Sequence, residues 1–596
     1  MNIEEKKYSY VKTILRGMPL QFKSAPWNFL IDNLLSVTNG ILLTLIVVAT
    51  QNLFDAITNA ASGQAGFGDC LIPLLVLAGL TFGQQIVDGI YNFHGVGVLW
   101  TKSTGRLMNL LHRKLQRIDP SKFEDTIFLD DLNKAMEGAK ATTMFCMTIV
   151  IGVCYYSVFF ASVGMYLFWL EPMLMFTLLM AFVPALISQI VRAKVFTKLE
   201  EQSAPLRRKY EYYQKTLCDR EYFKETRILG AFKFFHNLFI DTLLLLTCKI
   251  WQAERKTALL QLLLNATSFA GMAVASYILF TATMAGKITV GAFAAVFSAL
   301  GMIFYYMQEI INTHLGSMSR DIGKVANFIH MLDMPEYIGS DGNPDFSKGI
   351  VLENVSFTYP GKDTPAVKNV SLAIADRETI AIVGENGAGK STLVRLMTGI
   401  YRPSEGKVLI GGMDTAKIAP KSVYKSISGV FQKYQRYKMT LCENVAISDT
   451  EVEEETEVYA TKIEDILREV NAELSCVKLD TMLSPEFDGI DLSGGQWQQV
   501  AIARGLYRTN EFIILDEPTA AIDPIEETKV YTQFQSLTEG KCAVVVTHRL
   551  GSAKLAHRIV VMNDGKIVDM GTHEELIARP GKYADMWKAQ AQWYER

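Results

Sequence analysis

The sequence predicts an all-α membrane domain of six long helices fused to an α/β P-loop nucleotide-binding domain. Two observations lead to this fold class. Residues 28–332 contain six apolar stretches, each close to the roughly 20 residues that a membrane-spanning helix needs. Further along, a glycine-rich motif lies between an apolar β-branched run and a helical pattern, which is the context of a phosphate-binding loop.

The composition agrees with a membrane protein and excludes several other classes. Hydrophobic residues make up 49% of the 596 residues and charged residues only 20%, with many more apolar residues than an ordinary soluble enzyme needs. The net charge of −3 gives no electrostatic basis for binding nucleic acid. The eight cysteines form no CxxC pair, so they indicate buried thiols and neither a zinc site nor a disulfide framework.

Charge in the connecting segments orients the predicted spans. The loop 51–69 has no Lys or Arg, whereas segments 102–140 and 192–256 are rich in both. By the positive-inside rule the two long segments and both termini are cytoplasmic. The predicted spans are 28–51, 70–92, 142–167, 172–193, 258–282 and 288–311.

Composition also predicts the domain boundaries. A mixed basic and apolar stretch suggests an interfacial helix before the first span, and a turn-rich stretch precedes the soluble α/β pattern. The predicted domains are an N-terminal cytosolic or interfacial helix at 1–27, the membrane domain at 28–332, a linker at 333–349 and the nucleotide-binding domain at 350–596.

Each long cytoplasmic segment is interrupted by a charged, aromatic-bearing break. The breaks lie at 119–125 and 219–225, between patterns that continue the spanning helices into the cytosol. Such a break is either a docking tip for a neighbouring domain or an ordinary solvated loop. Periodicity alone favours neither.

The run from Gly384 to Thr392 is the predicted phosphate-binding loop. Its glycines let successive backbone N–H groups face an anion, and the following helix N-terminus adds positive partial charge. Lys390 is expected to reach the β- and γ-phosphates, and the Ser391 hydroxyl to ligate Mg²⁺. The alternative is a tight strand-to-helix turn that needs glycine only for its shape.

Two more motifs fit a nucleotide site. The apolar run that begins at Phe512 ends in two carboxylates, which would place Asp516 near Mg²⁺ and Glu517 where it can polarise an attacking water. The glycines in the run from Leu492 to Gln496 open another helix, which is a second anion-binding N-terminus.

These three motifs resemble, in order, the Walker A, Walker B and signature sequences of ATP-binding cassette (ABC) transporters. Four shorter stretches extend the resemblance. They are Gln432 in a Q-loop, His548 in a switch position, Asp523 in a D-loop and Tyr359 in the place of the aromatic residue that stacks on adenine. All of them occur in the family's order within residues 350–580. Six spans before one cassette resemble a half-size exporter.

The resemblance implies the type IV (ABC exporter type I) fold, with ATP and Mg²⁺ as cofactors. It also implies a dimer in which each nucleotide lies between the Walker A motif of one chain and the signature of the other, with Glu517 and His548 as catalytic residues. The implied metal ligands are Ser391, Gln432 and Asp516. The implied nucleotide contacts are Tyr359, Gly384, Glu385, Asn386, Gly387, Ala388, Gly389, Lys390, Ser391, Thr392, Gln432, Ser493, Gly494, Gly495, Gln496 and Asp523. The resemblance also implies that the two cytoplasmic breaks are coupling helices.

Intact catalytic motifs favour a homodimer and leave a heterodimer open. The signature continues into Trp497 in place of the usual basic residues, and the Q-loop continues from Gln432 to Thr440 in an unusual form. At both places the sequence resembles bacterial exporters of lantibiotics and related peptides. No protease domain is expected before the first span. Glu486 is a candidate contact of a coupling helix.

The expected partners are a second half-transporter, a transported peptide or amphipathic small molecule, and membrane lipids, with no nucleic acid. The expected location is a bacterial inner membrane, with the cassette in the cytoplasm. A multidrug exporter or a flippase for lipids or lipid-linked oligosaccharides has the same architecture, and a nucleotide-gated channel is a more remote alternative. Asp88 and Glu309 either attract a basic substrate or serve helix packing.

Overall fold

The computed structural model describes residues 10–337, 339–450, 456–470, 474, 477–517, 538 and 540–591. The chain separates into two compact units, a helical unit and a cassette unit. The helical unit comprises Met1–Leu115 and Asp130–Met334, and the cassette unit comprises Gln116–Leu129 and Pro335–Arg596. The first cytoplasmic break therefore belongs to the cassette unit, although in sequence it lies between helices of the membrane part.

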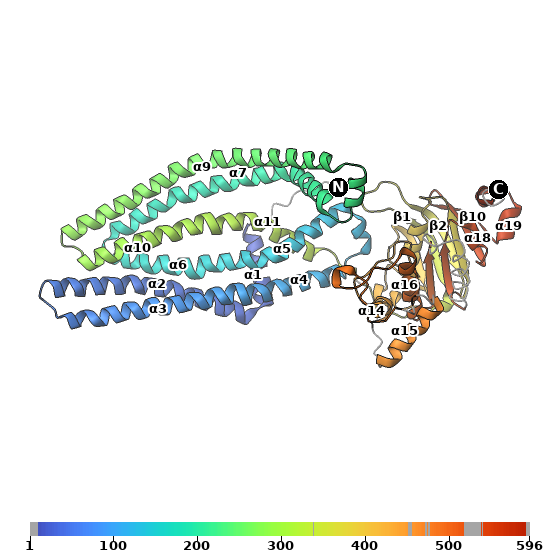
Figure 1. Ribbon diagram of the computed structural model, residues 1–596, viewed down its shortest axis with the longest axis horizontal. Coiled ribbons are helices and arrows are strands. Elements are labelled where there is room, and N and C mark those ends of the chain that lie inside the picture. The colour runs from blue at the N-terminus through green and yellow to red at the C-terminus, as the bar shows by residue number, and fades with distance from the viewer. Residues whose placement is uncertain are drawn as a thin grey trace. The chain divides into compact units, whose positions relative to one another are not determined.

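Long helices build the helical unit (Figure 1). In chain order its elements are α1 (Tyr10–Ser24), α2 (Pro26–Ala61), η1 (Phe67–Cys70), α3 (Leu71–Asn92), η2 (Phe93–Trp100), α4 (Thr101–Leu115), α5 (Thr126–Val150), η4 (Ile151–Tyr156), α6 (Ser157–Leu170), α7 (Pro172–Cys218), α8 (Phe223–Ile228), α9 (Phe232–Met284), α10 (Val290–Glu309), η5 (Ile310–Leu315) and α11 (Gly316–Asp333). The segments η2, η4 and η5 are π-helical and continue their neighbours without a break.

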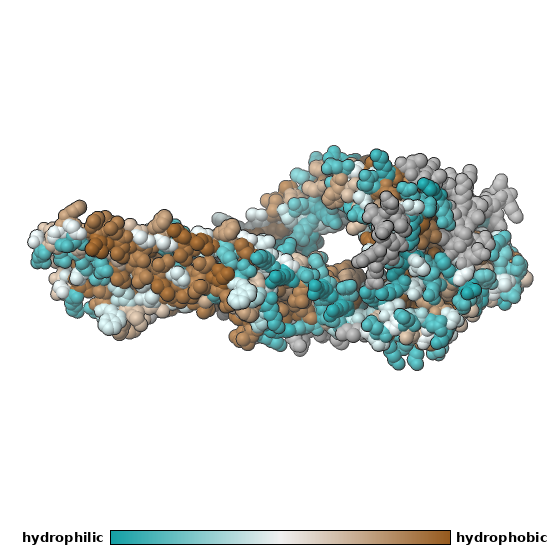
Figure 2. All heavy atoms as spheres, turned by 90° about the horizontal axis from the view of Figure 1, so that it is seen from below, coloured by the Kyte–Doolittle hydropathy of each residue, from teal (hydrophilic) through white to brown (hydrophobic). Residues whose placement is uncertain are grey.

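Apolar composition makes these helices able to span a bilayer. Five helical stretches of the described residues are long and apolar enough to cross one: Pro26–Ala61, Phe67–Leu115, Thr126–Leu170, Phe232–Met284 and Val290–Glu309. The predicted fourth span, 172–193, lies in α7, several of whose side chains are outside the described residues. Figure 2 shows hydrophobic side chains gathered over the long helices, as expected of surface that faces lipid.

Close helix packing depends on small residues. A Cβ atom on Gly138 of α5 would lie 2.1 Å from the Lys324 carbonyl oxygen of α11, so only glycine fits at this crossing. Beside it, Phe145, Cys146 and Val325 are fully buried in one cluster. This is the small-residue packing that lets membrane helices approach closely.

Polar side chains inside the helical unit bond to one another. Asp88 of α3 accepts hydrogen bonds from Asn39 (2.9 Å) and Asn92 (3.1 Å), and Gln84 donates to Asn39 at 3.1 Å. These contacts tie α3 to α2, which supports helix packing as the role of Asp88.

The N-terminal helix α1 is anchored on one side and apolar on the other. Arg16 pairs with Asp333 of α11, and Gln21 donates to Ser103 of α4 at 3.0 Å. Val11 and Leu15 are 63% and 68% exposed. An amphipathic helix of this kind fits the interface of a bilayer.

Two sheets build the cassette unit. The first is antiparallel, in the order β2-β1-β4-β5, and the second runs β10-β9-β3-β8-β7-β6 with five parallel strands and β10 antiparallel to β9. The strands are β1 (Ile350–Phe357), β2 (Val367–Ile374), β3 (Thr379–Gly384), β4 (Glu405–Ile410), β5 (Met413–Asp414), β6 (Ile427–Val430), β7 (Phe512–Asp516), β8 (Cys542–Val546), β9 (Arg558–Asn563) and β10 (Lys566–Gly571).

Short helices connect these strands. The described ones are η3 (Pro120–Glu124), η6 (Phe346–Lys348), α12 (Lys390–Met397), α13 (Pro420–Tyr424), α14 (Leu441–Ala446), α15 (Thr456–Val470), η8 (Pro485–Phe487), α16 (Gly494–Tyr507), α18 (Leu550–Ala553), α19 (His573–Ala578) and α20 (Lys582–Ala591).

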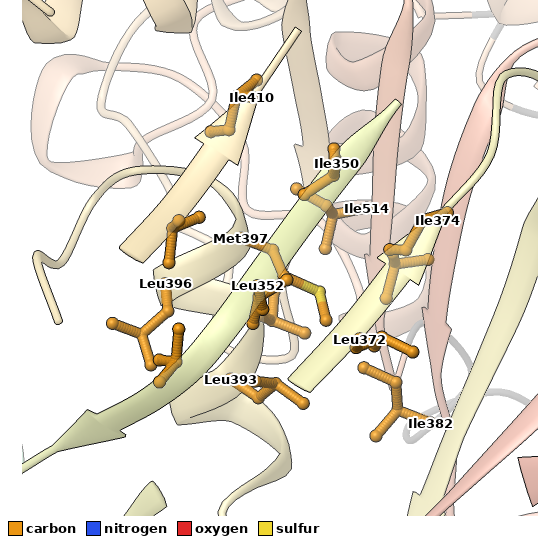
Figure 3. Close-up of a cluster of buried hydrophobic side chains, with 14 of the residues drawn as sticks. Ile350, Leu352, Leu372, Ile374, Ile382, Leu393, Leu396, Met397, Ile410 and Ile514 are labelled. Atoms are coloured by element: carbon orange, nitrogen blue, oxygen red, sulfur yellow. The ribbon is translucent and has the colours of Figure 1, made fainter. Parts of the chain in front are cut away.

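The main core of the cassette unit is formed by side chains of both sheets and of the P-loop helix α12 (Figure 3). Leu393, Leu396 and Met397 of α12 are fully buried against strands of both sheets. The strand residues that Figure 3 labels are Ile350, Leu352, Leu372, Ile374, Ile382, Ile410 and Ile514. The helix that begins at the phosphate-binding loop is thus held by packing on both sides.

Truncating this core should destabilise the cassette unit. Leu393 is 0% exposed, so Leu393→Ala removes buried methyl groups and leaves a cavity, at a cost of about 2–5 kcal/mol. We expect a fall of several degrees in the melting temperature of the detergent-solubilised protein. Leu555→Ala, at a site that is 47% exposed, is the matched control and should shift melting very little. Equal shifts for the two variants would contradict this account of the core.

Candidate nucleotide-binding and catalytic site

The phosphate-binding loop follows β3 and opens α12, as its sequence predicts. Gly389 is the N-cap of α12 and has φ +95°, and a Cβ atom there would lie 2.5 Å from the Ala366 carbonyl oxygen. This position therefore requires glycine. Lys390 folds over the loop and donates to the carbonyl oxygens of Gly384 (2.9 Å) and Glu385 (3.0 Å).

Lys390 is only 6% exposed, and this burial lowers the pKa of its ammonium group. A buried cation is costly unless an anion accompanies it. The carboxylates of Glu517 and Asp516 supply part of the opposing charge. A phosphate in the loop would supply more, so the buried ammonium group favours an anion site over a turn shaped only by its glycines.

The end of β7 carries two carboxylates with different surroundings. Asp516 is 8% exposed, and its Oδ1 atom has no hydrogen-bond partner among the described residues. Burial, followed by the charge of Glu517, raises the pKa of Asp516, although the Ser391 hydroxyl hydrogen-bonds the carboxylate. An orphaned, buried carboxylate oxygen beside a serine hydroxyl is a donor set that suits Mg²⁺.

Glu517 has a left-handed backbone conformation with φ +49°, which residues other than glycine rarely adopt. Its N–H donates to the Val546 carbonyl oxygen of β8 at 2.9 Å, which fixes the backbone there. Strained residues of this kind cluster at active sites, where the surrounding structure holds them.

Two side chains meet the Glu517 carboxylate. Gln432 donates its Nε2–H to Oε2 at 2.6 Å, and His548 Nδ1 lies 3.4 Å from Oε1. Gln432 follows β6, Glu517 follows β7 and His548 follows β8, and these three strands are neighbours in one parallel sheet. The carboxyl ends of parallel strands meet at one edge, so the topology brings these residues together.

The C-terminal helix α20 supports this edge. Gln590 donates to the His548 carbonyl oxygen at 2.5 Å and accepts from the Leu550 N–H at 3.0 Å. Lys582 pairs with Glu385 of the phosphate-binding loop at 2.5 Å. The sequence did not predict these contacts, because nothing local in a surface helix marks a glutamine or a lysine as part of a distant site.

Tyr359 belongs to an aromatic cluster beside the phosphate-binding loop. Its hydroxyl lies 2.9 Å from Thr392 Oγ1, and its ring packs edge-on against Phe357 and Tyr401 at centroid distances of 5.1 and 5.9 Å. Arg395 donates to the hydroxyls of Tyr359 (3.2 Å) and Tyr401 (3.1 Å). Stacking of Tyr359 on adenine stays a prediction.

The first cytoplasmic break contacts the same cluster. It forms the short helix η3, capped by Asp119, whose side chain accepts from the Ser121 N–H. Glu124 at its end accepts from the Tyr401 hydroxyl at 2.6 Å and pairs with Arg395 at 3.3 Å. The break is therefore held against the P-loop helix, and these contacts fit the docking hypothesis better than a solvated loop.

The signature run begins α16. Ser493 and Gln496 form a reciprocal capping box, in which each side chain accepts from the other residue's backbone N–H (3.3 and 3.0 Å). Cβ atoms on Gly494 and Gly495 would meet nothing within 4 Å. Among the described residues, no hydrogen bond joins this run to the phosphate-binding loop of the same chain.

Other predicted residues lie apart from this site or outside the described residues. Asp523 is outside the described part of the chain. Glu486 pairs with Lys438 at 2.5 Å, both half exposed. The second break, 219–225, ends in α8 within the helical unit, where Ile228 and Leu229 are 86% and 69% exposed.

Comparison with known proteins agrees with these observations. Residues 367–520 match the family model described as ABC transporter. The subtilin transport ATP-binding protein of Bacillus subtilis is 27% identical over 98% of this chain and 95% of its own length. The nisin transport ATP-binding protein of Lactococcus lactis is 36% identical over 39% of each chain, and the ATP-dependent lipid A-core flippase of Salmonella typhimurium is 32% identical over 51% of this chain and 52% of its own.

A solved structure of a bacterial Atm1-family ABC exporter with ATP bound has the same fold. Its TM-score is 0.79 at 21% identity, and the similarity covers 96% of this chain and 99% of that one. The predicted fold class is therefore confirmed, with a membrane domain and an ATP-binding cassette in one chain. Residues 367–520 are thus an ABC transporter ATP-binding domain, and the whole chain has the architecture of an exporter half-transporter, an ATPase coupled to transport.

Proposed function

We propose that this chain exports a ribosomally made peptide, modified or unmodified, as a homodimer driven by ATP hydrolysis. The observation that carries this proposal is the alignment of nearly the whole chain, 98%, with a subtilin transport protein. The lipid A-core flippase aligns over only 51%. Since the membrane domain contacts the substrate, similarity that includes that domain is the better guide to the substrate.

At the nucleotide site, the geometry around Glu517 supports the proposed roles. Its carboxylate is the general base that polarises the attacking water, and Gln432 and His548 orient it from either side. Lys390 and the backbone N–H groups of the loop from Gly384 to Thr392 hold the phosphates.

Asp516, Ser391 and Gln432 are the residues that would hold Mg²⁺. The unpartnered Oδ1 of Asp516 and the adjacent Ser391 hydroxyl support this assignment. When bound, the cation neutralises phosphate charge.

The position of the signature run supports a dimer. Among the described residues no hydrogen bond joins the N-terminus of α16 to the phosphate-binding loop of its own chain, and the space beside Gly494 and Gly495 is open, which suits closure over a nucleotide held by a second copy. Asp523 is proposed to contribute at the same interface. Closure of the two cassettes on ATP is the event that drives transport.

The coupling path begins at the nucleotide and leads through Tyr359, Arg395 and Tyr401 to Glu124 in the first cytoplasmic break. Directly after the second break, the exposed apolar residues Ile228 and Leu229 form a surface that suits the cassette of a second copy. With the basic segments facing the cytoplasm, both termini and the cassette lie in the cytoplasm of a bacterial cell.

A flippase for lipids or lipid-linked oligosaccharides is the second candidate, and the similarity to lipid A-core flippases over half the chain favours it over a channel. The complete set of catalytic side chains also disfavours a channel, since a gate need not hydrolyse ATP.

Transport in inside-out vesicles separates these candidates. We expect ATP-dependent accumulation of a labelled cationic precursor peptide, absent with ADP and absent for Glu517→Gln. Movement of a fluorescent lipid without peptide accumulation would replace peptide export by lipid flipping.

Glu517→Gln should stop turnover and retain ATP, because the amide cannot accept a proton while the loop still binds the phosphates. We expect hydrolysis to fall by at least about 100-fold, within the range lost with a general base. Radiolabelled ATP bound after gel filtration should rise. Glu511→Gln, directly before β7, is the control and should hydrolyse ATP normally. Normal hydrolysis by Glu517→Gln would overturn the assignment of the base.

Glu124→Gln should separate ATP hydrolysis from transport. The change removes the ion pair with Arg395 while both partners are about 40% exposed, so stability should change by no more than about 1 kcal/mol. We expect hydrolysis within about threefold of the parent and transport reduced about tenfold, as measured in the same vesicles. Glu137→Gln, which removes an exposed pair with Lys324 in the helical unit, is the control. Parallel loss of both activities would contradict the coupling role.

A further inference from the structure

Residues 432–440, here called the strap, run along the signature helix α16. The strap begins at Gln432, which contacts Glu517, and ends at Thr440, the N-cap of α14. It is the stretch that departs from the family's usual Q-loop. Its contacts with α16 occur at two separate points.

The first point is at the N-terminus of α16. The Tyr434 hydroxyl donates to the Gly494 carbonyl oxygen at 2.9 Å. The Tyr434 ring is half-buried and packs against the hydrophobic cluster that contains Trp497 and Leu492. A side chain of the strap therefore holds the first residue of the signature helix.

The second point is near the C-terminus of α16. Arg504 donates to the Gln435 carbonyl oxygen at 3.3 Å, and its guanidinium lies 4.9 Å from the centre of the Tyr437 ring. Asn444 accepts from Arg504 at 3.1 Å through its side-chain oxygen and donates to the Tyr437 carbonyl oxygen at 3.1 Å. This end is fixed by several bonds.

These two attachments determine which residues of the strap connect the nucleotide site to the signature helix. Gly494 and Arg504 are separated by about 15 Å of helix. Near the C-terminal end of α16 the strap is held through Tyr437 by Arg504 and Asn444, and near the N-terminal end it is held through the ring and the hydroxyl of Tyr434. Only Lys433, an exposed residue, separates Gln432 from Tyr434. Residues 432–434 therefore connect the Glu517 carboxylate to Gly494 through the Tyr434 hydroxyl.

We propose that Tyr434 is a positioning residue that couples the two nucleotide sites of the dimer. It links the Gln432–Glu517 contact of one site to the signature helix of the same chain, which serves the other site. This inference rests on the proposed function, in which each site combines the phosphate-binding loop of one chain with the signature of the other.

Mixed dimers test the direction of this coupling. Two differently tagged copies are co-expressed as full chains and purified through both tags, with Glu517→Gln in one copy only. The remaining active site then uses Glu517 of the unmodified copy and the signature of the copy that carries Glu517→Gln. Tyr434→Phe, which removes only a hydroxyl, is introduced into either copy.

We expect ATP turnover to fall about fivefold, the typical value of one hydrogen bond, when Tyr434→Phe and Glu517→Gln are in the same copy. Turnover should change less than twofold when they are in different copies. The opposite pattern, equal effects in both arrangements, or no effect in either would overturn the proposal. Tyr424→Phe is the matched control, because its hydroxyl also donates to a glycine carbonyl, that of Gly399 at 3.4 Å, but lies outside the strap.

The mixed dimer that carries only Glu517→Gln in one copy is measured first. If it has no ATP turnover, this result counts against independent nucleotide sites in the proposed function. The coupling is then tested in homodimers that carry Gln432→Ala, Tyr434→Phe or both. Because Tyr434 acts through Gln432, the double variant should lose no more turnover than Gln432→Ala alone. If the reductions in turnover caused by Gln432→Ala and by Tyr434→Phe multiply in the double variant, the proposal is overturned.

Discussion

The hydrogen bond between Gln432 and Glu517 is the contact around which the nucleotide site is arranged. It joins the ends of two parallel strands, and the adjacent strand adds His548 on the other side of the same carboxylate. Glu517 is also held in a left-handed conformation by its bond to β8. A carboxylate with this many constraints has little freedom, so a change in what occupies the site must be taken up by its neighbours.

Those neighbours lead out of the site in different directions. Gln432 continues into the strap and reaches the signature helix through Tyr434, whereas Thr392 and Arg395 of the P-loop helix reach Glu124 through the aromatic cluster. Because α12 is packed between two sheets, it transmits displacement as a rigid body. One route therefore leaves the site through the strap to the signature helix, and the other leaves it through the aromatic cluster to Glu124.

The helical unit contrasts with the cassette in how its helices are held. Helices approach closely at Gly138, and polar side chains such as Asn39 and Asp88 bond across the α2–α3 contact. In lipid, such bonds and close backbone packing replace much of the hydrophobic driving force that holds the cassette core. This arrangement suits helices that must rearrange during transport.

The sequence by itself determined the fold class and pointed to candidate residues of the nucleotide site, because glycine loops, carboxylate-ended strands and apolar 20-residue stretches are local patterns with local causes. The structure brought Gln432, Glu517 and His548 together as the resemblance implied. Only the tertiary structure decided that Gln590 supports His548, that Tyr434 holds Gly494 and that Glu124 meets Arg395 and Tyr401. These contacts join residues far apart in the chain. They depend on strand order and on which surfaces meet, and no pattern of neighbouring residues encodes either.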